Sequence, residues 1–138
     1  MPPMFGLPLL LALLLGGAAG TAARVLISQQ LFPAMPGSFP VGTLMVNWSG
    51  SLLIGLLTGA VMFTFAPELS FAFVVLGYGF LGAFTTVSSL SVECLMMLRA
   101  GHARLAIGYL AASVAGGLLL TGAGLGLMLA WSRVSLSW

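Results

Sequence analysis

The sequence predicts an all-α membrane protein, a single domain over residues 1–138 with four transmembrane helices. Of the 138 residues, 60% are hydrophobic and only 4% are charged. A soluble domain carries about 25% charged residues, so this chain has too few to cover a surface that faces water. Four apolar segments each exceed the ~20 residues that cross a ~30 Å hydrocarbon core. Backbone groups find no water inside lipid, so spans of this kind must be helical.

The four spans are separated by short connections. The spans run roughly over Met4–Leu31, Val41–Phe65, Ser70–Leu98 and Arg104–Trp131. The connections contain turn-forming Pro and Gly, and they are Phe32–Pro40, Ala66–Glu68 and Ala100–His102. The first apolar run is longer than the hydrophobic part of a secretory signal, and no basic residue precedes it, which argues against a cleaved leader. We expect no extramembrane domain, so any function acts in or across the bilayer.

The few charged residues hardly specify an orientation. Arg99 and Arg104 share one side of the membrane, whereas Arg133 and Glu68 lie on the other. The positive-inside rule weakly places the loop between the third and fourth spans in the cytoplasm. A margin of one or two Arg permits insertion in both directions, and hence an antiparallel dimer.

Glycine is abundant, with 19 residues. Gly16-x-x-x-Gly20 and Gly55-x-x-x-Gly59 are patterns of small residues that let helix backbones approach closely. The fourth span continues the pattern with Gly116, Gly117, Gly122, Gly124 and Gly126. Four thin, closely packed helices leave no room for a central aqueous pore, so we expect any transport path at an interface between subunits.

The third span has an unusual centre. Between Gly77 and Glu93 it places three glycines and five hydroxyl residues at mid-membrane depth. This composition predicts a break in the helix between Gly82 and Thr86, and a broken helix frees carbonyls for a cation and amides for an anion. Beyond the break, Thr86, Ser89 and Glu93 follow at i, i+3 and i+7 and form one polar face. The alternative is a stripe of hydroxyls that bond the carbonyls of their own helix.

Two further polar residues lie in apolar surroundings. Asn47 is about seven residues into the second span, where it either holds helices together, worth about 0.6 kcal/mol, or offers amide donors to a small anion. Arg24 closes the first helix, either as an anchor at the interface or as a positive charge that attracts anions. Glu93 is a candidate to form an ion pair with Arg24 or Arg99.

Enzymatic function is not indicated. The chain has no paired carboxylates and no phosphate-binding loop, and the single His102 lies in a connection. Cys94 is the only cysteine and lies in an apolar stretch, where we expect it to pack. Four Arg are too few for a nucleic-acid surface, so we expect no nucleic-acid partner.

Three segments together resemble the Fluc (CrcB-type) fluoride channel family over nearly the whole chain. They are Gly16–Gly20 leading to Arg24, Gly42–Asn47 with Gly50, and Gly79–Thr86 running on to Ser91 and Glu93. The resemblance implies a multi-pass protein of the bacterial inner membrane that exports cytoplasmic fluoride by passive flow. It also implies an antiparallel dual-topology dimer with two fluoride pores at the interface.

The resemblance assigns roles to individual residues. Asn47 is expected in the pore, and Ser88 and Ser89 are expected in a hydroxyl track. The backbone carbonyls of Gly82 and Thr85 are expected to hold a structural sodium ion at the dimer interface. The remaining expected positions are Arg24 and Glu93 in a vestibule and Tyr109 and Ser113 as pore-lining residues of the fourth span.

One departure from the family pattern affects the pore. The family usually reads Thr-Thr-Phe-Ser-Thr-Phe-Ser, and its two phenylalanines present positive ring edges to the anion. This chain has Val87 and Leu90 at those two pore positions. Two alternatives therefore stay open: a non-conducting or half-active subunit of a heterodimeric fluoride channel, and a proton-coupled exporter similar to the small multidrug resistance family. The second requires an acid in the first helix, and that span has none.

Overall fold

The computed structural model describes residues 6–33, 38–64 and 71–135. Within these residues it contains four helices long and apolar enough to cross a membrane: Leu7–Leu31, Val41–Phe63, Phe73–Arg99 and Ala103–Val134. The four expected spans are therefore confirmed. Their predicted limits at Met4, Phe65 and Ser70, and the connection Ala66–Glu68, lie outside the described residues.

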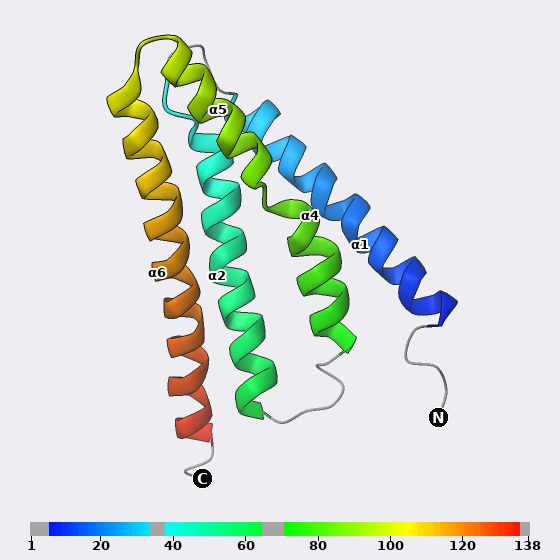
Figure 1. The fold of residues 1–138 in the computed structure, drawn as a ribbon. Helices are drawn as coiled ribbons and strands as arrows, with labels where there is room; N and C mark the ends of the chain where they lie inside the picture. Colours follow the sequence, from blue (N-terminus) through cyan, green and yellow to red (C-terminus); the bar gives the residue numbers. More distant parts are fainter. Residues whose placement is uncertain (1–5, 34–37, 65–70, 136–138) are drawn as a thin grey trace.

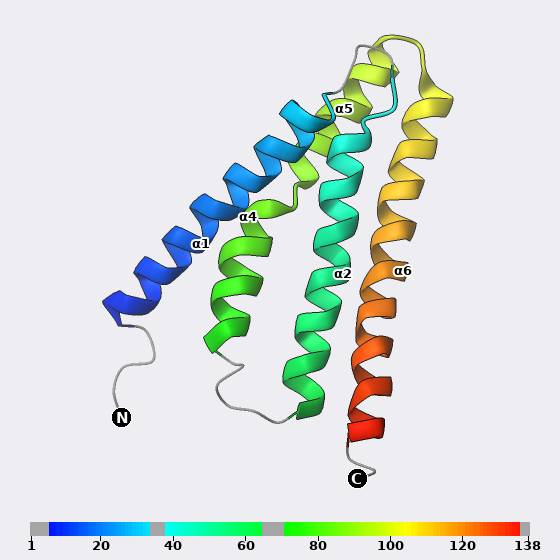
Figure 2. The same cartoon turned by 180° about the vertical axis from the view of Figure 1, so that it is seen from behind.

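The elements follow one another as an up-and-down bundle (Figure 1). They are α1 (Leu7–Val25), the π-helix η1 (Leu26–Leu31), α2 (Val41–Thr64), the π-helix η2 (Phe73–Leu81), α4 (Gly82–Phe84), α5 (Val87–Arg99) and α6 (Ala103–Ser135). Helices α2 and α6 run side by side, while the N-terminal end of α1 leans away from them, as the reverse view in Figure 2 confirms. The turn between α5 and α6 uses Gly101 with φ +80°, a left-handed conformation that glycine adopts without a Cβ clash.

Close backbone contact joins α2 to α6. A Cβ at Gly55 would collide with the backbone of Thr121, and one at Gly124 would lie only 2.7 Å from the Leu52 carbonyl oxygen. Next to this contact, the Trp48 ring fills the space that a side chain at Gly116 would need. The Gly55-x-x-x-Gly59 pattern therefore does what its spacing predicts: the absence of side chains lets the backbones of α2 and α6 come into contact.

A second glycine contact joins α1 to the third membrane span. A Cβ at Gly16 would lie 3.1 Å from the Val75 carbonyl oxygen, and one at Gly20 would collide with the carbonyl of Phe80. Gly122 and Gly126 of α6 have no atom within 4 Å of a Cβ position. The sequence pattern is thus confirmed for both spaced pairs, whereas these two later glycines face outward.

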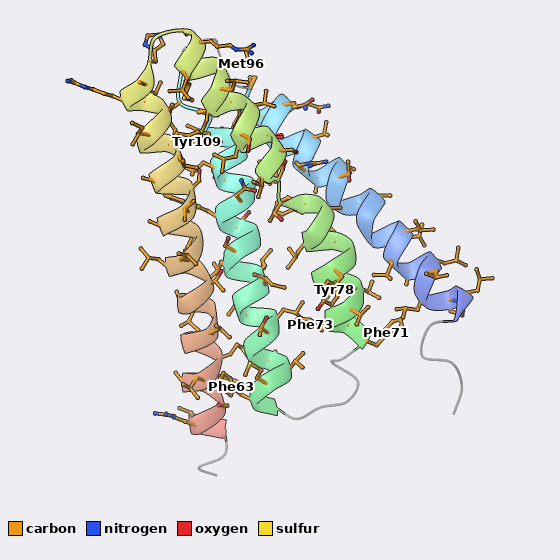
Figure 3. The ribbon with its side chains drawn as sticks, in the orientation of Figure 1. Phe63, Phe71, Phe73, Tyr78, Met96 and Tyr109 are labelled. Carbon is orange, nitrogen blue, oxygen red and sulfur yellow. The ribbon has the colours of Figure 1, made fainter. Side chains whose placement is uncertain are left out.

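Few side chains are buried within the single chain. One cluster joins α2, α5 and α6 through Leu44, Leu90, Met97, Ala106 and Tyr109, and a second joins Val46, Leu81 and Phe84. Figure 3 shows Tyr109 near the end of the bundle that carries the α5–α6 turn. Large apolar side chains such as Leu14 and Leu118, 70% and 71% exposed, point away from the bundle. Such a surface suits contact with lipid or with another apolar protein.

The glycine contact between α2 and α6 gives a stability prediction. Gly55→Ala should lower the free energy of unfolding by about 1–3 kcal/mol, because its methyl group meets backbone that cannot move aside. Gly126→Ala is the matched control on α6 and should cause no loss, since its Cβ position is open. Unfolding in mixed micelles of increasing SDS content measures both values. Equal stability of the two variants would contradict the packing described here.

Candidate functional site

The third membrane span is interrupted at Thr85 and Thr86. Helix α4 ends at Phe84, and the backbone is extended at Thr85 (φ −75°, ψ 155°) and at Thr86 (φ −149°, ψ 118°) before α5 begins at Val87. Figure 1 shows the bend between α4 and α5. The predicted break between Gly82 and Thr86 is confirmed, and it falls at the C-terminal end of that range.

Asn47 of α2 binds the broken segment through both ends of its amide group. The backbone N–H of Thr86 donates to Asn47 Oδ1 at 2.8 Å, and Asn47 Nδ2 donates to the Thr86 carbonyl at 2.9 Å. These are the two bonds that a neighbouring β-strand would provide. The Asn47 amide has two N–H donors, so one of them remains beyond this pair of bonds.

The Thr86 side chain begins the second half of the helix. Its Oγ1 accepts the backbone N–H of Ser89 at 3.1 Å and so caps the N-terminus of α5. The same oxygen lies 3.1 Å from the hydroxyls of both Ser88 and Ser89. Ser91 instead donates to the carbonyl of Val87, one turn earlier. The alternative, a hydroxyl that bonds a carbonyl of its own helix, therefore holds for Ser91, whereas the hydroxyls at the break bond one another.

Two carbonyls at the break lose their usual helical donors. In a continuous α-helix the carbonyl of Gly82 accepts from the N–H of Thr86, and that of Thr85 accepts from the N–H of Ser89. Here those two N–H groups donate to Asn47 Oδ1 and to Thr86 Oγ1. Backbone oxygens released in this way are the ligand type that a hard cation prefers. The two carbonyls are the ones expected from the sequence to hold sodium, and the residues fit that ion.

A cavity of about 400 Å³ lies beside the break and is open toward the outside of the chain. Its lining includes six of the residues expected at the site: Asn47, Gly82, Thr85, Val87, Leu90 and Ser113. Val87 is 75% exposed, whereas Leu90 is also part of the buried cluster with Tyr109. Residues far apart in the sequence thus meet in one cavity formed by α2, the broken helix and α6.

Ser113 has an unusual environment on the α6 side of this cavity. Its side chain is only 7% exposed, and its Oγ has no hydrogen-bond partner among the described residues. Buried hydroxyls are nearly always paired, often with a carbonyl one turn earlier in the helix. Ser113 thus places a buried hydroxyl without a hydrogen-bond partner in the wall of the cavity.

A second, more polar cavity of about 300 Å³ lies toward the α5–α6 turn. It is lined by Ser28, Gln29, Pro33, Thr43, Ser89 and Glu93. The Glu93 carboxyl group accepts hydrogen bonds from Thr43 Oγ1 and from the Tyr109 hydroxyl, both at 2.6 Å. These two hydroxyls occupy Glu93 in place of the expected ion pair with Arg24 or Arg99.

Some expected site residues lie outside both cavities. Tyr109, expected to line a pore, is fully buried and lines neither cavity, because its hydroxyl is turned to Glu93. The side chains of Arg24 and Ser88 also line neither cavity, although the carbonyl of Arg24 accepts the hydroxyl of Ser28 at 2.7 Å. Thr43 was not predicted as a site residue from the sequence. Its position one turn before Asn47 is the feature that could have indicated it.

Comparison with known proteins identifies relatives over most of the chain. The family described as CrcB-like protein, Camphor Resistance (CrcB), matches residues 11–125. A relative from Pseudomonas fluorescens strain Pf-5, named fluoride-specific ion channel FluC, is 44% identical over 88% of this chain and 97% of its own. FluC 1 of Symbiobacterium thermophilum is 47% identical over 85% and 93%. FluC 2 of Moorella thermoacetica is 42% identical over 76% and 84%.

The Asn47 bonds predict a specific loss of stability. Asn47→Leu keeps the size of the side chain but leaves the N–H and the carbonyl of Thr86 unpaired, at about 1–3 kcal/mol for each buried group. We expect the free energy of unfolding to fall by about 2–4 kcal/mol. Ser49→Ala, which removes only bonds to the carbonyls of its own helix, should change it by less than about 0.5 kcal/mol. Comparable values for the two variants in SDS unfolding would show that Asn47 does not support the break.

Proposed function

This chain belongs to the CrcB-like protein family, and we propose that it is a fluoride-selective ion channel of the membrane, not an enzyme. The names of its relatives support this activity. Within the structure, the observation that carries the proposal is the cavity at the broken helix, where an unpaired buried hydroxyl and freed backbone groups meet in mid-membrane. Irregular backbone at this depth is found where it lines a cavity or pathway.

The transported ion reaches the cell as a neutral acid. Hydrogen fluoride crosses lipid uncharged and ionises at cytoplasmic pH, which traps the anion inside. A channel then exports fluoride passively, down its gradient. A narrow, dry path with a few hydroxyl and amide donors favours a small anion, because a larger one such as chloride cannot approach those donors as closely.

The two cavities suggest the course of the path. The polar cavity at Ser89 and Glu93 is the vestibule, with Arg24 one turn before Ser28 on the adjoining helix. Thr86 lines the larger cavity and bonds Ser89, which lines the vestibule. From this hydroxyl link the path continues past Asn47 to Ser113. Each step offers an O–H or N–H donor, the chemistry that replaces part of an anion's hydration shell.

The functional unit is proposed to be a dimer. The cavity at the break is open on one side, and Val87 at its edge is 75% exposed. A second chain packed against this face would close the path, and an antiparallel arrangement would create two such paths. The weak charge asymmetry of the chain allows both orientations in the bacterial inner membrane. A heterodimer with a related subunit is the alternative that Val87 and Leu90 favour, because that partner would supply the aromatic edges.

A sodium ion is proposed at the break, held by the backbone carbonyls of Gly82 and Thr85. Support comes from the diversion of their helical donors and from the exposure of Gly82 on the open face. When bound, the ion would neutralise the carbonyl end of α4 and add a fixed positive charge between two subunits.

The test of this function is fluoride efflux from liposomes that contain the purified chain. We expect efflux selective for fluoride over chloride but slow, because Val87 and Leu90 lack the aromatic edges, each worth on the order of 1 kcal/mol. Val87→Phe with Leu90→Phe should raise it by up to about thirtyfold, the equivalent of about 2 kcal/mol.

Three other outcomes discriminate the alternatives. Efflux that appears only with a phenylalanine-bearing relative would identify a heterodimer subunit. Fast, selective efflux by the unmodified chain would refute the need for aromatic edges. No fluoride efflux from any of these preparations would refute the channel.

Dual topology is testable by cysteine labelling in a Cys94→Ala background. A cysteine at His102, in the α5–α6 turn, or at Arg133, near the other end of α6, should react with a membrane-impermeant maleimide from both sides of the membrane. About half of each variant should be labelled from each side if the chain pairs with itself. Labelling of each position from one side only would contradict the antiparallel homodimer and would leave a distinct partner subunit.

A further inference from the structure

A second hydroxyl on the 400 Å³ cavity has no assigned role. Ser51 of α2 and Ser113 of α6 line the same cavity, and these two helices pack against each other. No hydrogen bond from Ser51 Oγ is recorded among the described residues, and Thr121 bonds only the backbone carbonyl of Ser51, at 3.0 Å. Two serines of different helices therefore line one cavity, and neither hydroxyl has a hydrogen-bond partner among the described residues.

The position of Ser51 is explained by Gly117. Residue 117 follows Ser113 by four positions and so lies about one turn further along the same face of α6, about 6 Å away along the helix axis. A Cβ at Gly117 would lie 3.2 Å from Ser51 Oγ and 4.0 Å from Ser51 Cβ. The Ser51 hydroxyl thus stands close to where a side chain of residue 117 would be. Glycine at 117 leaves room beside the Ser51 hydroxyl, which a side chain at 117 would contact closely.

We propose that the Ser51 hydroxyl is a pore-lining donor that continues the fluoride path beyond Ser113, in place of the side chain that residue 117 lacks. The inference rests on the proposed channel function. The ligand class is a small desolvated anion, because both hydroxyls can turn their protons to it and neither must give up a protein partner. The path then alternates between helices: Ser113 comes from α6 and Ser51 from α2.

Substitutions at residues 51 and 117 can place this hydroxyl on α6 instead of on α2. Ser51→Ala should reduce fluoride efflux from liposomes by roughly tenfold, the effect of one hydrogen bond to a charged group, and should raise the half-saturating fluoride concentration. The double variant Ser51→Ala with Gly117→Ser places an O–H at nearly the same point from α6 and should restore both values. Ser51→Ala with Gly117→Ala is the matched control, since it adds the same Cβ without a hydroxyl, and should not restore them.

The measurements are best made in the Val87→Phe, Leu90→Phe background, with folding verified by elution volume and SDS unfolding. Efflux by Ser51→Ala equal to that of its parent would overturn the role of Ser51. Restoration by Gly117→Ala as well as by Gly117→Ser would assign the effect to packing and would also overturn it. If the parent, the unmodified chain and the chain reconstituted with a phenylalanine-bearing relative all show no fluoride efflux, the channel function itself fails, which separates that failure from failure of the Ser51 proposal.

Discussion

The two hydrogen bonds between Asn47 and Thr86 make the broken helix compatible with the membrane. A backbone group without a partner costs several kcal/mol in hydrocarbon, and a break exposes such groups on both sides. Asn47 satisfies the N–H and the carbonyl of one extended residue with a single amide, and Thr86 Oγ1 satisfies the next free N–H. The carbonyls of Gly82 and Thr85 remain without their helical donors. The backbone groups that the site leaves exposed are therefore those that the Asn47 amide and the Thr86 hydroxyl do not bond.

The glycine contacts place Asn47 where this bond can form. Gly55 and Gly124 hold α2 against α6, and Gly20 holds α1 against the third span. Asn47 lies on α2 about two turns before Gly55, so its amide reaches the break from a fixed backbone. Close packing of this kind leaves no open space along the axis of a small bundle. The 400 Å³ cavity instead opens at the side of the bundle. Tight packing and a lateral path are thus two consequences of the same glycine-rich composition.

Much of the fold could be predicted from composition and spacing, because a membrane admits few alternatives. Hydrophobic length gave the four spans, and small residues with hydroxyls at mid-membrane depth indicated the break. Partners across helices were harder to predict, since they depend on the rotation of each helix, which spacing does not determine. Glu93 was therefore paired with Arg24 or Arg99 on charge alone, whereas Thr43 and Tyr109 hold it. Ser51, one turn after Asn47, received no role of its own from the sequence for the same reason, because its contact with the Gly117 position exists only after α2 and α6 are packed.

The break also brings opposite partial charges close together in a medium that screens them poorly. Helices η2 and α4 end with their carbonyls at Phe84, and α5 begins with its amides at Val87, only three residues later. The carbonyl end of a helix favours a cation and the amide end favours an anion. A cation at Gly82 and Thr85 would thus stabilise an anion near Ser89 and Asn47 without a charged side chain between them. Such a site can attract an anion and still release it, because hydroxyls and helix ends bind less tightly than a buried arginine would. The scarcity of charge in this sequence, which first indicated a membrane protein, would also let an anion leave the proposed path.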